Sequence, residues 1–323
     1  MYLDVTYTNG VIAAREKYLL KDKIFRLCEL GAEDAFRLLC ESGYGSGAEA
    51  TDVYDYEKLI AAEENALDAF IREYAPSAQE AAYLLSPRDF HNAKAFLKAA
   101  YLQEDAEKML APQGLIEKET LSACVGNNDF SALEAYPYLQ KACKEASALL
   151  QEQPSGAKVG EIFEKALYAH LQETVKRKKA LKRLLAAKTD MTNILIAFRC
   201  GNEKSAVNKY LPGGDLSEKK LATLFLSDFE KIRKAFSGTP YQDFVGLCLE
   251  SKEKNEPFTA AEKILGGYDT AHFAVRKFDL VKSEPFLYYV YRRRSENANV
   301  RIVFVCLLAG LSEQDIKKRI RAM

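Results

Sequence analysis

Apolar residues recur along most of the chain at the spacing of one face of an α-helix. Two examples are a stretch with Leu59, Ile60, Leu67, Phe70 and Ile71, and a longer one with Ile162, Phe163, Leu167, Leu171, Leu181, Leu184 and Leu185. Alternation typical of strands is absent, apart from a weak candidate in YLDVTY at positions 2–7. The pattern therefore predicts an all-α protein.

Capping signals predict where several helices begin. The order Ser86-Pro87-Arg88-Asp89 is that of a helix N-terminus, with a serine cap, proline at the first position and an acid at the third. Further starts are predicted by capping-box pairs and by an acid–proline step: Thr259 with Glu262, Ser312 with Asp315, and Glu284 with Pro285.

The helical pattern contains an internal repeat anchored on asparagine. After Asn92, Asn193 and Asn299, the third, fifth and seventh residues are apolar or cysteine. An acid stands three residues before each asparagine: Asp89, Asp190 and Glu296. A glycine follows Asn92 by 22 residues and Asn193 by 21, and a leucine follows each glycine by 7. The same spacing occurs near the N-terminus in Asn9, Gly31 and Leu38.

This repeat predicts one compact body made of similar helical units. We place unit boundaries at 1–85, 86–187 and 188–282, with 283–323 as C-terminal helices that pack against the N-terminal unit. A reaction centre would normally be singular. We therefore interpret the repeated acids and asparagines as packing elements, which bond backbone groups at a helix junction or meet an arginine of a neighbouring unit.

Composition limits the function classes. The chain of 323 residues has 46 Lys plus Arg and 46 Asp plus Glu, so no overall field attracts nucleic acid or acidic lipid, and any electrostatic partner must be met by a local patch. The seven cysteines are odd in number and lack C-x-x-C spacing, which argues against disulfides or zinc and for a reducing compartment. The longest uncharged apolar run, Ile302–Leu311, is half of the roughly 20 residues a membrane span needs. With no signal-peptide pattern, the sequence predicts a soluble protein.

Catalytic motifs are sparse. No phosphate-binding G-x-x-x-x-G-K-[ST] loop or G-x-S-x-G elbow occurs. GYGSG at 43–47 follows a helix, which predicts a helix stop and turn. Glu63 and Glu64 are interpreted as a solvated helix face. No two histidines have helical ligand spacing, so satisfied structural roles are expected for His91, His170 and His272. We predict no catalytic residue, cofactor, metal or small-molecule substrate.

Two basic stretches stand out. Lys176–Arg183 extends a predicted amphipathic helix, and an arginine triplet precedes the last asparagine. The simpler interpretation is a solvated face with ion pairs within the helix, and the sharper one is a surface for an acidic protein partner. Nucleic acid is disfavoured because the chain has no Trp and no aromatic series beside these charges. The candidate partner-facing or inter-unit residues are Arg292, Arg293, Arg294 and Arg301.

Several short motifs occur in a specific order over almost the whole chain, from about Tyr7 to Arg319. They are Tyr7-Thr-Asn9 with Arg15-Glu16-x-x-Leu19-Leu20, Asp89-x-x-Asn92, Asp190-x-x-Asn193 with Arg199, Leu211-Pro-Gly-Gly-Asp-Leu-Ser217, Thr239-Pro-Tyr241, and Glu284-Pro-Phe286 with Glu296-x-x-Asn299-Val-Arg301. Together they resemble the C subunit of bacterial and archaeal V-type (A-type) ATPases, the family of the d subunit in the eukaryotic enzyme. One copy departs from the pattern, with APQGLIE in place of LPGGDLS.

The resemblance implies an all-helical funnel of three similar units about a pseudo-threefold axis. It also implies a non-catalytic peripheral subunit on the cytoplasmic face, one copy per complex. Such a subunit links the central shaft to the membrane proteolipid ring and transmits torque between ATP turnover or synthesis and proton or other ion transport. Two alternatives remain: a helical-repeat adaptor for a peptide or protein partner outside the motor, and a helical enzyme with a deep pocket gathering a histidine and carboxylates.

Overall fold

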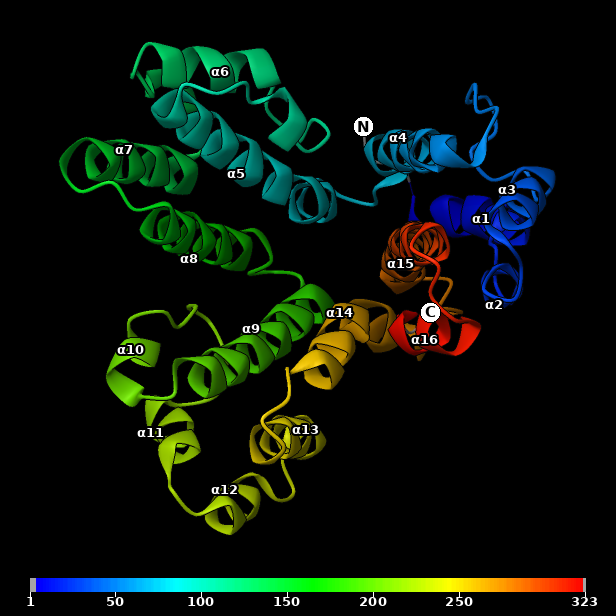
Figure 1. The fold of residues 1–323 in the computed structure, drawn as a ribbon. Helices are drawn as coiled ribbons and strands as arrows, with labels where there is room; N and C mark the ends of the chain where they lie inside the picture. Colours follow the sequence, from blue (N-terminus) through cyan, green and yellow to red (C-terminus); the bar gives the residue numbers. More distant parts are fainter. Residues whose placement is uncertain (1–3, 322–323) are drawn as a thin grey trace. The chain divides into compact units, whose positions relative to one another are not determined.

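Helices are the only regular elements in the computed structural model, which describes residues 4–321 (Figure 1). The prediction of an all-α protein is confirmed. The described chain forms two compact units. Unit 1 contains the described residues up to Ala78 and those from Thr259 onward, and unit 2 contains Gln79–Phe258. The boundaries predicted after residues 85, 187 and 282 stay a prediction.

Unit 1 is organised around one long helix, α15 (Glu284–Leu308). This helix contacts both the N-terminal helices and α14 and α16, and its buried residues lie on all sides of it. The C-terminal helices α15 and α16 therefore belong to the same compact unit as the N-terminal helices. The other elements of unit 1 are α1 (Val5–Arg15), η1 (Glu16–Tyr18), α2 (Lys23–Leu27), α3 (Ala32–Glu41), η2 (Val53–Asp55), α4 (Tyr56–Tyr74), α14 (Thr259–Ala274) and α16 (Glu313–Arg319).

Unit 2 is a series of helices joined by short connections. One apolar cluster joins its first four α-helices and includes Phe90, Leu121, Leu139 and Phe163. The remaining helices pack mainly around α9. The elements are α5 (Ala78–Leu102), η3 (Glu107–Met109), α6 (Lys118–Gly126), η4 (Ser131–Leu133), α7 (Pro137–Glu152), α8 (Gly156–Thr174), α9 (Lys179–Cys200), α10 (Glu203–Val207), α11 (Glu218–Ala222), η5 (Thr223–Phe225), α12 (Phe229–Phe236) and α13 (Gln242–Glu253).

Several predicted helix starts are confirmed. Ser312 caps α16, where its Oγ accepts from Asp315 N at 3.3 Å. The acid–proline step at Glu284 begins α15. GYGSG at 43–47 is a turn that follows α3. The weak strand candidate is wrong from residue 5 onward, because Val5 begins α1; positions 2 and 3 lie outside the described residues.

Two predicted boundaries are wrong. Ser86-Pro87 does not start a helix, because α5 runs through Pro87. Proline removes only one backbone donor, and buried Leu84 and Leu85 hold the preceding turns in the core. Lys176–Arg183 is not one continuous helix either, since α8 ends at Thr174 and α9 begins at Lys179. In the break, Lys178 Nζ lies 3.1 Å from the carboxylate of buried Glu80.

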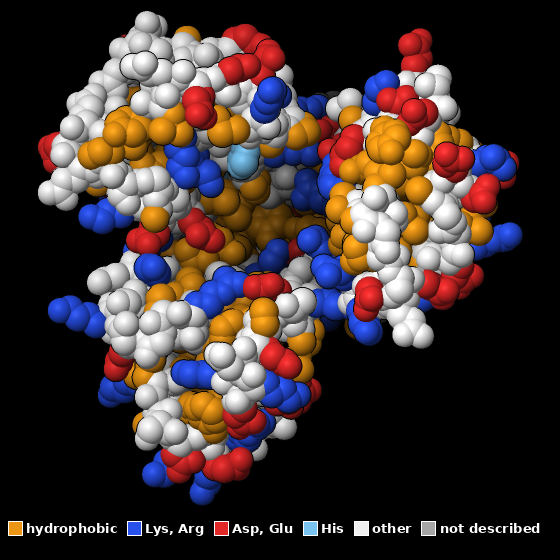
Figure 2. Space-filling view, in the orientation of Figure 1, with side chains coloured by type: hydrophobic (Ala, Val, Ile, Leu, Met, Phe, Trp, Pro, Cys, Tyr) orange, Lys and Arg blue, Asp and Glu red, His pale blue; other side chains and the backbone are white. Residues whose placement is uncertain are grey.

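Most of the cysteine side chains lie in the apolar interior. All seven thiols are free, and most are buried. Burial raises the pKa of Cys143 and of Cys248 to about 12, so both remain protonated apolar side chains at neutral pH. On the face shown in Figure 2, acidic and basic side chains are interspersed with apolar ones. No helix within residues 4–321 is both long enough and apolar enough to cross a membrane.

His170 on α8 is a titratable side chain of unit 2, and the surrounding core shifts its pKa. Its ring lies 5.4 Å from that of Phe90 and 6.1 Å from that of Tyr138. Burial lowers the pKa of His170 below its ordinary 6.5, because the charged imidazolium loses water in this setting.

We expect His170 to make the stability of the chain depend on pH. A lowered pKa means that the unfolded chain takes up the proton first, so this contribution is present above about pH 6.5 and is lost as the pH falls through the folded-state pKa. The melting temperature of the wild type should fall more steeply than that of His170→Gln between about pH 7 and pH 5. If the melting temperatures of the two proteins changed in parallel across this pH window, the result would contradict the assignment.

Candidate functional site

Helix α9 holds the following loop through one acid and one asparagine. Asp190 accepts hydrogen bonds from the backbone N–H groups of Asp215 and Leu216, each at 3.0 Å. Asn193 donates to the carbonyl oxygen of Leu211 at 3.0 Å and accepts from its N–H at 2.8 Å. Four bonds from one helix turn therefore satisfy backbone groups of a loop that has no secondary structure to pair with. We name this arrangement the acid–asparagine motif.

Helix α5 carries the same motif. Asp89 accepts from the N–H of Leu115 at 2.9 Å and from that of Ile116 at 3.0 Å. Asn92 accepts from the N–H of Ala111 at 2.8 Å and donates to its carbonyl at 3.3 Å. The sequence repeat thus corresponds to a repeated set of hydrogen bonds to backbone groups at a helix junction.

The glycines that follow Asn92 and Asn193 at nearly equal distances have a steric cause. A Cβ at Gly214 would lie 2.1 Å from Asp190 Oδ1, and one at Gly114 would lie 2.2 Å from Asp89 Oδ1. No side chain fits where the carboxylate packs directly on the backbone. Tyr241, from the Thr239-Pro-Tyr241 motif, also joins this copy, because it donates its hydroxyl hydrogen to Asp190 Oδ2 at 2.6 Å.

In unit 1 the motif on α15 takes its partners from both ends of the chain. Asn299 accepts from the N–H of Arg321 at 2.9 Å and donates to its carbonyl at 3.1 Å. Glu296, however, accepts at 3.3 Å from the N–H of Lys21, far away in sequence. The N-terminal segment therefore supplies the amide donor that a following loop supplies in the other two copies.

The N-terminal spacing of Asn9, Gly31 and Leu38 does not form the motif. Asn9 has no acid three residues before it, and its Nδ2 donates to carbonyl oxygens at the end of the α14–α15 connection: Leu280 at 2.9 Å, Lys282 at 3.1 Å and Asp279 at 3.4 Å. Nothing lies within 4 Å of a Cβ built at Gly31. The equal spacing is therefore not accompanied by equal contacts. Asn9 is nevertheless buried, and it joins two segments that lie far apart in the sequence.

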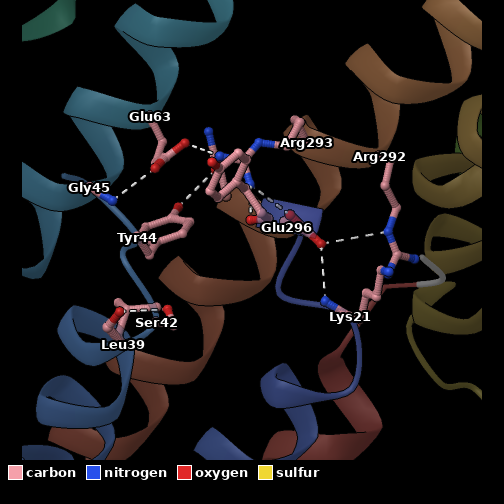
Figure 3. A network of polar contacts seen from close by, with 11 residues as sticks. Lys21, Leu39, Ser42, Tyr44, Gly45, Glu63, Arg292, Arg293 and Glu296 are labelled. Carbon is pink, nitrogen blue, oxygen red and sulfur yellow. Dashed lines mark hydrogen bonds and ion pairs between the residues drawn. The ribbon is translucent and has the colours of Figure 1, made fainter. Parts of the chain in front are cut away.

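A buried charge network surrounds the acid of α15 (Figure 3). Arg293 is 8% exposed, and its Nη1 lies 3.1 Å from Glu296 and 3.3 Å from the carbonyl oxygen of Tyr18. Its Nη2 bonds the carboxylate of Glu63 on α4. Arg292 Nε lies 3.6 Å from Glu296. Two arginines thus face two acids inside unit 1.

The GYGSG turn closes this network. Tyr44 donates its hydroxyl hydrogen to Asn297 Oδ1 at 2.8 Å, and the N–H of Gly45 donates to Glu63 at 2.8 Å. Gly45 has φ +68°, and a Cβ there would lie 2.7 Å from Leu59, so only glycine fits. Burial raises the pKa of Tyr44, and it raises that of Glu296 against the opposing charge of Arg293.

The candidate arginines divide into internal and partly exposed ones. Arg292 and Arg293 are buried in the network. Arg301 lies 2.8 Å from Glu57 and 3.5 Å from Glu64, both on α4. Arg294 is partly exposed, with its guanidinium 5.9 Å from the Tyr291 ring centre. Arg293 and Arg301 therefore join the predicted C-terminal segment to the predicted first unit, and contact of any of the four with a partner stays a prediction.

Residues 8–319 match the protein family described as ATP synthase (C/AC39) subunit. The chain belongs to this family. The match covers nearly the whole chain and confirms the resemblance to the family of the V-type ATPase C and d subunits. Family members are subunits of V/A-type ATPases, which are membrane-associated rotary complexes, and they assemble with other ATPase subunits. No curated protein matches the chain.

For Glu63, one acid of the buried charge network, the structure of this ATP synthase (C/AC39) family chain contradicts the interpretation drawn from the sequence. The expectation of a solvated face at Glu63 is wrong, because its side chain is only 13% exposed and pairs with Arg293. A signal is present in the sequence, since Glu63 falls between Ile60 and Leu67 on the apolar face of α4. Lys21 acts through its backbone N–H, which no side-chain pattern can reveal.

The histidines are dispersed over the two units. His91 lines an open pocket of about 460 Å³ in unit 2 together with Lys94, Glu161 and Glu164, and its Nε2 lies 2.8 Å from the carbonyl oxygen of Met109. His170 packs between aromatic rings instead. Within residues 4–321, no three His, Cys, Asp or Glu side chains are grouped so that they could hold a metal ion.

Replacing Asn193 should weaken unit 2. Asn193→Ala leaves the N–H and carbonyl of Leu211 without partners, at a cost of about 1–3 kcal/mol for each buried group. The urea midpoint should fall, and amide exchange at 211–216 should accelerate. Asn208→Ala is the matched control, because Asn208 is exposed in the same unit and should change stability by less than about 0.5 kcal/mol. Equal effects of the two substitutions would contradict the role given to the motif.

A buried and an exposed arginine of unit 1 should differ sharply in their effect on stability. Arg293→Leu leaves Glu63 without its cation and leaves Glu296 with Arg292 alone, which should cost about 3–5 kcal/mol. Arg37→Leu in the same unit is the control and should cost at most about 1 kcal/mol, because the ion pair of Arg37 with Asp34 on α3 is solvent-exposed. Chemical denaturation of both variants checks this, and a mild effect at Arg293 would show that the network is not required for folding. Charge reversal at Arg293 is accordingly a test of folding, not of partner binding.

Proposed function

We propose that this chain is the non-catalytic central-stalk coupling subunit of a rotary V/A-type ATPase. In this role it links the central shaft to the membrane proteolipid ring, one copy per complex, and transmits torque for ion transport. It acts as a peripheral subunit on the cytoplasmic face of the membrane. The family match over residues 8–319 carries the proposal, because it extends over nearly the whole chain.

The internal use of the polar side chains supports a mechanical role. The acids and asparagines singled out by the sequence bond backbone groups of this chain: Asp89 and Asn92 on α5, Asp190 and Asn193 on α9, and Glu296 and Asn299 on α15. Groups engaged in this way stabilise the fold and are not presented to a substrate. We infer that their function is to fix each long helix to its loop.

Torque transmission requires a body that resists shear between its helices. A hydrogen-bonded loop on a helix turn can slip only by breaking several buried bonds together, which is costly because each lost partner leaves a desolvated polar group. In unit 1, ion pairs between α4 and α15 add resistance, through Arg293 with Glu63 and Arg301 with Glu57. This is the construction expected of a coupler.

Copurification tests the proposal. The tagged chain, recovered from detergent-solubilised membranes of its source cells, should bring proteolipid and central-shaft subunits at about one copy of this chain per complex. A tagged Arg293→Leu variant provides a control, since a chain with a damaged unit 1 should recover less of both. Recovery of neither partner by the folded wild type, with the ATPase present in the lysate, would refute the coupling role and favour an adaptor outside the motor.

A further inference from the structure

The connection between α14 and α15 exposes a dense set of apolar side chains. Within residues 275–282, Val275 is 89% exposed, Val281 77%, Phe278 75% and Leu280 64%. Other large apolar residues exposed in the described chain are more scattered. Exposed apolar residues concentrated in one short segment mark an interaction site. We name residues 275–282 the apolar loop.

Basic residues are interleaved with these side chains. The apolar loop contains Arg276, Lys277 and Lys282 against one acid, Asp279. Lys277 Nζ lies 5.0 Å from the ring centre of Phe278. The other two bases have ion-pair partners but remain about half exposed, at 54% for Arg276 and 51% for Lys282. The loop therefore combines outward apolar groups with an excess of positive charge.

Hydrogen bonds from buried Asn9 and within the loop hold the backbone of the apolar loop, and its apolar side chains face outward. Asn9 binds the carbonyl oxygens of Asp279, Leu280 and Lys282. Turn bonds use further backbone groups, such as the bond from the N–H of Asp279 to the carbonyl of Arg276 at 3.1 Å. A loop whose carbonyl groups are bonded internally can enter a medium of low polarity without leaving them unsatisfied.

We propose that the apolar loop is an interfacial membrane-binding loop for anionic phospholipid. Val275, Phe278, Leu280 and Val281 enter the headgroup region, and Arg276, Lys277 and Lys282 bind lipid phosphates. Apolar burial and attraction of basic residues to anionic lipid act together in such binding. The excess of positive charge favours anionic lipid as the occupant over a second copy of the chain, because the apolar loop of a second copy carries the same charge. The proposal goes beyond the coupling role, which requires only protein partners.

Vesicle sedimentation tests the apolar loop with lipid alone. The purified full chain should bind phosphatidylcholine vesicles containing phosphatidylglycerol at least about tenfold more strongly than vesicles of phosphatidylcholine alone, and added salt should weaken binding. Replacing the four apolar residues together by serine should lower binding at least about tenfold. Lys277→Glu should lower it severalfold. Failure of the wild type to bind the anionic vesicles would overturn the proposal.

A matched control separates this loop from general surface apolarity. Tyr18 and Tyr54 are 64% and 74% exposed in the same unit, and a variant with serine at both should bind anionic vesicles as the wild type does. Equal loss in this control and in the four-serine variant would overturn the proposal. Because all these side chains are exposed, circular dichroism and melting should be unchanged, so that weaker binding cannot be attributed to unfolding.

Two further outcomes identify a different occupant. If the wild type binds no vesicles but the four-serine variant no longer copurifies with proteolipid, the loop docks on protein, and the lipid proposal fails while the coupling role stands. If the wild type forms dimers that the four-serine variant does not, and neither binds vesicles, the occupant is a second copy and the lipid proposal fails. Vesicle binding without copurification would refute the coupling role and leave the loop assignment in place.

Discussion

The backbone of the loops that follow the long helices sets the main constraint on this fold. These loops run against buried surfaces without strand or helix partners, and a buried N–H or carbonyl left without a hydrogen bond is costly. The acid–asparagine motif avoids this cost by supplying hydrogen-bond partners from a single helix turn. The carboxylate takes two successive N–H groups, as Asp190 does, and the amide takes a donor and an acceptor on one residue, as Asn193 does.

The same constraint explains why the two ends of the chain meet in unit 1. On α15 the asparagine finds its loop shortly downstream, at Arg321, but the acid finds its amide donor at Lys21. Glu296 is fully buried, so its charge also needs cations, which Arg292 and Arg293 provide. The requirement of one buried carboxylate therefore brings the N-terminal segment, α4 and α15 into a single network.

Sequence reasoning is strongest where a side chain carries the signal. The helical class follows from periodicity, and the spacing singles out Asp89 and Asn92, whose bonds to backbone groups are seen only in the structure. Sequence reasoning fails where tertiary packing overrides a local signal: Pro87 resembles a helix start, but buried apolar residues before it continue the helix. It also fails at Gly31, because a spacing records positions along the chain and not the contacts made there. Pairing across the chain, as of Glu63 with Arg293, needs the fold itself.

Asn9 shows how the motif can be redirected from internal packing toward the surface. It keeps the buried amide but lacks the acid, and its Oδ1 has no hydrogen-bond partner within the described residues, whereas the Oδ1 of Asn193 accepts a backbone N–H. Its Nδ2 instead gathers three carbonyls of the α14–α15 connection. With those carbonyls turned inward, side chains such as Phe278 and Val281 are turned outward. The element that closes a loop onto the core elsewhere in the chain here leaves the side chains of a loop exposed at the surface, because the amide fixes only the backbone.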